Sequence, residues 1–224
     1  MPHTLSALPH PAPTAPASRR GRTALVGGMA AGPLFLGAAI VQSFARDGFD
    51  FGRNAISQLA LGESGWVQTV NFSLAGALLI AGAAGLRRVV GGDAGGTWGP
   101  VLVGVFGISF WAAAAFPADA GAGFPVGAPG TTVMSGHGAA HMAAGMVGYL
   151  ALCAAFVVLS RPLATRGHRS WAVASRLVPV AVLVGFMASA ASVLAFTAGA
   201  GLGLLWLTAV TARLAMPPAP PRAA

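Results

Sequence analysis

The residues with the clearest chemical potential are the two histidines of HGAAH, His137 and His141. A separation of four residues places both imidazoles on one face of a helix, where they can supply two ligands to one metal ion. Asp119, which ends the sequence FPAD, offers a carboxylate as a third ligand and leaves a coordination position for water. Zinc would bring the pKa of that water close to neutrality. One interpretation of the cluster is therefore a zinc site at Asp119, His137 and His141 that supports hydrolysis.

Two polar residues, Ser57 and Asn71, are candidates for the catalytic role of orienting a substrate at such a site. The substrate would be a lipid or an amide near the outer leaflet of a membrane. No Gly-x-Ser-x-Gly elbow surrounds Ser57, and its base would have to come from another helix. The sequence around Ser57 therefore favours a lid or packing role over that of a nucleophile.

Two further interpretations of the same cluster stay open. In the first, Asp119 and the histidines hydrogen-bond to one another and to Asn71, and so close one end of a helix bundle or bind a ligand there. In the second, the cluster belongs to a transporter or a proton pathway, because ionisable residues inside a membrane are often functional. A pathway would need polar side chains through the whole membrane depth. The inner halves of the helices, away from this cluster, contain few polar side chains.

The scarcity of charge indicates what kind of scaffold positions these residues. Of 224 residues, 13 are basic and five are acidic, or 8% charged, whereas a soluble domain carries about 25%. The mean hydropathy of +0.73 is also too high for a surface that faces water. The net charge of +8 does not indicate nucleic-acid binding, because the arginines lie at the edges of apolar runs and form no basic face. The expected partners are membrane lipids.

Six stretches are long and apolar enough to cross a hydrocarbon core about 30 Å thick. We therefore predict an all-α integral membrane protein, a bundle of six transmembrane helices. The boundary between the last two helices is placed at the small residues 197–201, since one helix over 171–216 would be far longer than a bilayer is thick. The predicted spans are 23–45, 66–86, 98–116, 136–159, 170–193 and 198–216.

The distribution of arginine predicts the orientation of this bundle, since arginine concentrates on the cytoplasmic side. With both termini cytoplasmic, only Arg46 and Arg53 lie outside. The other arginines then lie inside: Arg19, Arg20, Arg22, Arg87, Arg88, Arg161, Arg166, Arg169, Arg176, Arg213 and Arg222. Asp119, both histidines and Asn71 fall on the outer side, so the site is expected to face outward from the cell membrane.

The segments outside the six spans have distinct predicted roles. Residues 1–22 and 217–224 are rich in proline and poor in apolar residues, which predicts disordered cytoplasmic tails. The first apolar run is too long for a cleaved signal peptide and is expected to stay as a helix. In the connection 46–65, apolar residues fall on one side of a helical projection, which predicts a short interfacial helix capped by Asp50.

The order of several short motifs resembles a known family. ISQL (56–59) precedes a span that contains Asn71 and Gly76, FPAD (116–119) ends the third span, and HGAAH (137–141) opens the fourth. This order is similar to that in the bacterial and archaeal six-helix membrane proteins grouped as the domain of unknown function (DUF) 998 family. The resemblance covers about Ala24 to Ala215. It implies a six-helix membrane fold and no established reaction.

Overall fold

The structure is a computed structural model that describes residues 19–216, with side chains described from residue 21. The predicted tails at 1–18 and 217–224 lie outside the described residues. Within the described range the fold is all-helical and has no strand. Its elements are α1 (Arg19–Phe44), η1 (Ile56–Ala60), α2 (Gly65–Val90), α3 (Trp98–Ala115), α4 (Gly136–Thr165), α5 (Arg169–Met187), η2 (Ala188–Ala190) and α6 (Val193–Ala215).

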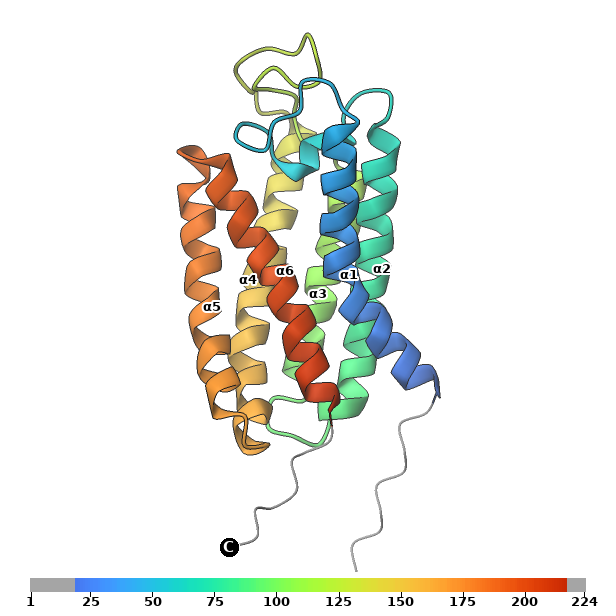
Figure 1. Cartoon of the computed structure of the whole chain (residues 1–224), viewed down its shortest axis with the longest axis vertical. Helices are drawn as coiled ribbons and strands as arrows, with labels where there is room; N and C mark the ends of the chain where they lie inside the picture. The colour runs from blue at the N-terminus through green and yellow to red at the C-terminus, as the bar shows by residue number, and fades with distance from the viewer. Residues whose placement is uncertain (1–18, 217–224) are drawn as a thin grey trace, which may run out of the picture.

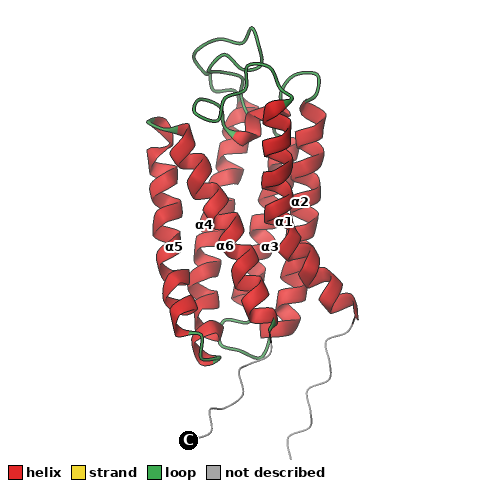
Figure 2. Ribbon diagram, viewed as in Figure 1, coloured by secondary structure: helices red, strands yellow, loops and turns green. Residues whose placement is uncertain are grey.

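The six long helices run up and down in chain order, as Figure 1 shows. Each packs against the next, and α6 closes the bundle by packing against α1. The connections 45–64 and 116–135 lie together at one end, which we call the long-loop end (Figure 2). The start of α1 and the end of α6 lie at the other end, which we call the terminal end.

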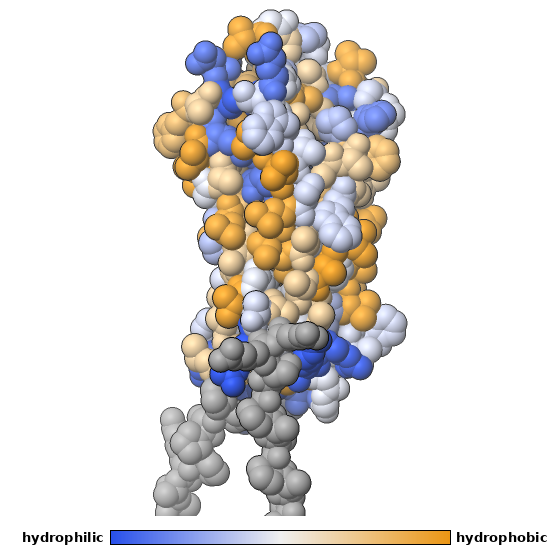
Figure 3. Space-filling model, turned by 90° about the vertical axis from the view of Figure 1, so that its right-hand side faces the viewer, coloured by the Kyte–Doolittle hydropathy of each residue, from blue (hydrophilic) through white to orange (hydrophobic). Residues whose placement is uncertain are grey.

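All six long helices have the length and apolar composition needed to span a membrane. The longest span, α4, covers 30 residues, and the shortest, α3, covers 18. Figure 3 shows the matching surface, with apolar residues around the middle of the bundle and hydrophilic ones toward both ends. The prediction of a six-helix membrane bundle is therefore confirmed. In this fold the side chains that face the membrane are apolar, as hydrocarbon requires.

Apart from α2 and α4, which extend to Val90 and Thr165, the structure differs from the predicted boundaries at three places. Residues 19–22, assigned to the tail, form the first turn of α1. Helix α5 ends at Met187 and α6 begins at Val193, so the small residues 197–201 lie within α6. The side chain of Ser192 accepts a hydrogen bond from the main-chain N–H of Ala195, and this cap starts α6 earlier than glycine content suggested.

The third difference concerns the connection 46–65, which forms only the five-residue 3-10 helix η1. Asp50 does not cap that helix. Its carboxylate instead accepts a hydrogen bond from the main chain of Gly52, 2.7 Å away, and pairs with Arg53. The residues that would have extended η1 toward the N-terminus form the turn at Asp50 instead.

Glycine allows close contact between α1 and its neighbours. A Cβ atom on Gly28 would lie 2.5 Å from the Cα of Gly82 on α2, and one on Gly32 would lie 2.9 Å from the carbonyl oxygen of Leu204 on α6. Membrane helices approach this closely only where side chains are absent, because lipid provides no hydrophobic force between them. The Gly28-x-x-x-Gly32 pair thus packs α1 against two different helices of the same chain.

The terminal end is held by Arg166, which follows α4. Its guanidinium donates to the carbonyl oxygens of Leu214 on α6 and Val89 on α2, each at 2.8 Å. It also forms an ion pair with Asp93 at 2.8 Å. One side chain therefore ties together the ends of three helices and the loop after α2.

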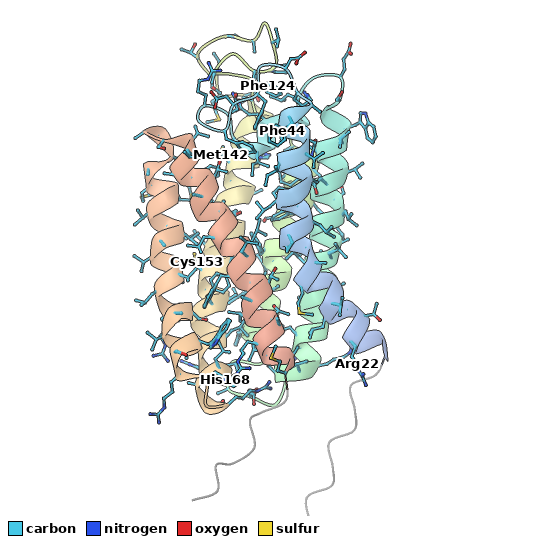
Figure 4. The ribbon with its side chains drawn as sticks, viewed as in Figure 1. Arg22, Phe44, Phe124, Met142, Cys153 and His168 are labelled. Carbon is cyan, nitrogen blue, oxygen red and sulfur yellow. The ribbon has the colours of Figure 1, made fainter. Side chains whose placement is uncertain are left out.

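The two long connections pack on each other at the long-loop end. Leu59 of η1, Ala39 of α1 and Phe124 form a small buried cluster there. Arg46 lies over the ring of Phe124, 5.2 Å from its centroid, and donates to the carbonyl oxygen of Leu59 at 2.9 Å. Figure 4 places Phe124 above Met142 of α4, so this cluster covers the long-loop end of the bundle.

Candidate functional site

Of the two histidines in HGAAH, His141 is the one that lies inside the bundle. Its Nδ1 is 2.8 Å from the carbonyl oxygen of Phe116, which follows the last turn of α3 in extended conformation. Because a carbonyl oxygen can only accept, Nδ1 carries the proton. The ring also packs edge-on against Phe72 of α2, with 6.2 Å between the ring centroids. The HGAAH and FPAD motifs are thus joined directly, through an imidazole and a main-chain carbonyl.

Asp119 holds Ser135, the residue that caps the N-terminus of helix α4. Its carboxylate accepts hydrogen bonds from the main-chain N–H of Ser135, at 2.9 Å, and from the Ser135 hydroxyl. That hydroxyl in turn accepts from the main-chain N–H of Gly138 at 3.0 Å. A Cβ atom at Gly138 would lie 1.8 Å from the Asp119 carboxylate, so glycine is what lets the carboxylate approach the helix. Negative charge is also favourable at a helix N-terminus.

These contacts lower the pKa of Asp119. The hydrogen bond from the Ser135 side chain contributes most, followed by the bond from the Ser135 main chain, and the nearby His137 and His141 contribute less. Hydrogen bonds to a carboxylate stabilise its ionised form. Asp119 therefore acts as an ionised carboxylate that holds the capping residue Ser135 in place.

Asn71 belongs to a separate polar network between α1 and α2. Its amide donates to the carbonyl oxygen of Phe35 at 3.1 Å and to the side chain of Gln68 at 3.0 Å. The amide of Gln42 donates to the same Gln68 oxygen at 2.7 Å. Polar groups at membrane depth are costly unless they pair, and these three side chains pair with one another. Gln42 Oε1 and Gln68 Nε2 are buried without a partner among the described residues.

Gln58 connects the two long loops above this region. Its side-chain amide donates to the carbonyl oxygen of Asp119 at 3.2 Å, and its side-chain oxygen accepts from the main chain of Ala55 at 3.1 Å. Through these bonds η1 is fixed relative to the loop that carries FPAD. The neighbouring Ser57 lies half-buried beneath the loops.

A cavity of about 320 Å³ lies between the helices in the half of the bundle nearer the long-loop end. Sites for small molecules run from roughly 300 to 1,000 Å³, so this cavity can hold a small ligand. Its deepest lining residues, Tyr149 of α4 and Leu204 of α6, lie near the middle of their helices. The lining is mainly apolar, and it includes the polar residues Ser57, Ser109, His141, Tyr149, Ser189 and Thr197.

The structure thus separates the residues that the sequence grouped. Ser57 and His141 line the cavity, whereas Asn71 lies in the network between α1 and α2. His137 is exposed and packs against the ring of Phe116, with 5.7 Å between the centroids. Asp119, Asn71 and His141 make their hydrogen bonds to other groups and not to one another.

Across residues 19–216, no group of three or more His, Cys, Asp or Glu side chains is arranged to hold a metal ion. The donors nonetheless have the types that zinc takes, so the zinc site at Asp119, His137 and His141 stays a prediction. Binding zinc there would require His137 to turn inward and Asp119 to leave its Ser135 partner.

Sequence reasoning missed Tyr149 and Thr197. The signal for Tyr149 was present, because His141, Gly145 and Tyr149 are spaced four residues apart and share one face of α4. The hydroxyl of Thr197 is buried and has no hydrogen-bond partner among the described residues. No local sequence pattern placed Thr197 in the cavity lining, because its place there depends on the start of α6 at Val193.

Comparison with known families matches residues 29–215 to the family described as "Protein of unknown function (DUF998)". A search of curated proteins and a search of solved structures each gave no significant match. The family match begins within α1 and ends at the last residue of α6, so it covers the cavity and both long loops. The chain therefore belongs to the DUF998 family, whose function is unknown, and it has the six membrane-spanning helices that the motif order implied.

Proposed function

We propose that this protein binds one apolar chain of a lipid or a similar amphiphile in the cavity beneath its long loops. The observation that carries the proposal is the cavity itself, with a volume of about 320 Å³ and a lining of aromatic and aliphatic side chains. Well-packed interiors contain few voids larger than a water molecule. A mainly apolar space of this size is poorly suited to water and well suited to an alkyl chain.

The floor and walls of the cavity fit a slender apolar ligand. Tyr149 packs against Phe186 at 4.8 Å between ring centroids and against Phe106 at 5.1 Å, which makes a rigid aromatic base. On α4, Met142 and Met146 line the cavity and are 51% and 53% exposed, respectively. Methionine adapts to varied apolar shapes, so these two side chains can follow an alkyl chain.

The location of the cavity in the membrane follows from the arginines. We infer that the protein spans the cell membrane with its terminal end in the cytoplasm, since Arg87, Arg88, Arg166, Arg169 and Arg213 all lie near that end. The cavity then lies at the depth of the outer leaflet. Lipid chains are available there at high local concentration.

The test uses a photoreactive decyl probe, which carries a diazirine on its chain, and protein in lipid nanodiscs. Labelled peptides are mapped by mass spectrometry, with and without an excess of unlabelled decanol. Specific binding appears as labelling of α4 and α6 cavity residues that the competitor removes, whereas labelling of the lipid-facing surface persists. Absence of competed labelling at these residues would refute the proposal.

A matched pair of glycine substitutions sharpens this test. Gly145 lines the cavity, and a Cβ atom there meets nothing within 4 Å, so Gly145→Leu fills the space without a clash. Gly37 of α1 has the same open surroundings but is exposed and lies outside the cavity lining. We expect Gly145→Leu to lose the competed labelling and Gly37→Leu to keep it. The two substitutions change helix propensity alike.

A further inference from the structure

We propose that the occupant of the cavity carries a neutral hydrogen-bond donor as its head group, a hydroxyl or an amide N–H, which His141 Nε2 accepts. This proposal rests on the proposed function and adds the chemical class of the ligand. It follows from the hydrogen bond that fixes the tautomer of His141 and from the absence of charge in the cavity lining.

The contact with Phe116 determines what His141 can offer a ligand. Nδ1 donates its proton to the Phe116 carbonyl oxygen at 2.8 Å, so in the neutral ring Nε2 has a free lone pair. Nε2 has no hydrogen-bond partner among the described residues, and this atom is not fully enclosed by protein. Because the side chain lines the cavity, this acceptor is available to a ligand.

The remaining lining residues exclude an ionised head group. In the described part of the chain, the cavity is lined by no arginine, lysine, aspartate or glutamate. A carboxylate, a phosphate or an ammonium group would therefore be buried without a counter-ion, which is strongly unfavourable. A neutral polar group has no such cost if it finds a hydrogen-bond partner.

Three hydroxyl groups of the lining are not free to bind a ligand. The hydroxyl oxygen of Thr197 is enclosed by protein and has no hydrogen-bond partner within residues 19–216, so it does not face the open space of the cavity. The Ser109 hydroxyl donates to the carbonyl oxygen of Phe106 at 2.7 Å, and the Tyr149 hydroxyl donates to that of Ala200 at 3.3 Å. A ligand hydroxyl or amide can thus donate to His141 Nε2, while the protons of Ser109 and Tyr149 are already used.

The test compares three photoreactive decyl probes that differ only in the head group: an alcohol, its methyl ether and a carboxylate. Apparent affinities are taken from competed labelling of the cavity residues in nanodiscs. We expect the alcohol to bind about fivefold more tightly than the ether, since the ether lacks the donated hydrogen bond. The carboxylate should bind most weakly. Equal binding of alcohol and ether, or tightest binding of the carboxylate, would overturn the head-group assignment.

Variants identify the residues responsible. His141→Phe should remove the preference for the alcohol while ether binding persists, which also shows that the cavity is intact. Thr197→Val and Ser109→Ala should both leave the preference unchanged, because the Thr197 hydroxyl is enclosed by protein and the Ser109 hydroxyl already donates to Phe106. If His141→Phe keeps the full preference for the alcohol, His141 is not the acceptor. If no probe shows competed binding to the unmodified protein, the proposed function itself fails.

Discussion

His141 and Phe116 form the contact that organises the candidate site, with 2.8 Å between the imidazole Nδ1 and the main-chain carbonyl oxygen. Phe116 directly follows Ala115, the last residue of α3, so its carbonyl oxygen takes no part in the hydrogen-bond pattern of the helix. The bond fixes the imidazole between α3 and α4 and leaves Nε2 free of protein partners. An orphan carbonyl at a helix end thereby determines the hydrogen-bonding character of the cavity.

Zinc binding can be decided by metal analysis. We expect protein purified from zinc-supplemented cells to contain no stoichiometric zinc, because Asp119 is already bonded to Ser135 and His141 to Phe116. The hydrolase hypothesis makes the opposite prediction. One zinc per chain that is lost in both His137→Ala and His141→Ala, and kept in a His168→Gln control, would establish the metal site.

The stability of the terminal end should depend on pH through His168. Its Nδ1 lies 3.0 Å from the guanidinium of Arg213, which can only donate, so the imidazole accepts there and is neutral. Burial lowers the pKa of His168 from its ordinary value of 6.5, and the charges of Arg213 and Arg166 lower it further. Figure 4 shows His168 at this end of the bundle, whereas Met142 of the cavity lining lies toward the other end.

The direction of the effect follows from proton binding. Below pH 6.5 the unfolded chain takes up a proton at His168 that the folded protein resists, so stability is full above that pH and falls as the pH decreases toward the lowered pKa. His168→Gln has no such proton, and its stability relative to the unmodified protein should rise between about pH 7 and pH 5. Thermal unfolding in detergent measures this, and parallel pH profiles would contradict it.

Packing of α1 on α2 should be sensitive to the size of residue 28. A Cβ atom at Gly28 would lie 2.5 Å from the Gly82 Cα, so Gly28→Leu must push the helices apart. Overpacking of this kind costs about 1–3 kcal/mol of unfolding free energy. Gly37→Leu, in open space on the same helix, should be close to neutral in the same denaturation assay. Equal stability of the two variants would show that the close contact is not required.

The orientation is tested by cysteine labelling in a Cys153→Ala background. Val133 is exposed in the second long loop, and Ser170 is exposed at the terminal end. We expect a membrane-impermeant maleimide to label Val133→Cys on intact cells and to label Ser170→Cys only after permeabilisation. The reverse pattern would invert the assigned topology and place the cavity at the cytoplasmic leaflet.

What the sequence determined by itself is the membrane architecture. The length and hydropathy of each span are local properties of the sequence, and hydrocarbon accepts only apolar stretches of that length. The six helices could therefore be predicted from the sequence alone. The pairing of Gln42, Gln68 and Asn71, by contrast, was not predicted, since the sequence grouped Asn71 with Asp119 and the histidines.

Only the tertiary structure decided which polar residues share a site. His137 and His141 satisfy the same helical spacing, yet one is exposed and the other lines the cavity, because the path of the loop 116–135 brings Phe116 to His141 and Asp119 to Ser135. Thr197 joined the cavity because the Ser192 cap begins α6 before the glycine-rich residues. Loop paths and caps depend on contacts between residues distant in the chain, and spacing along one helix does not contain them.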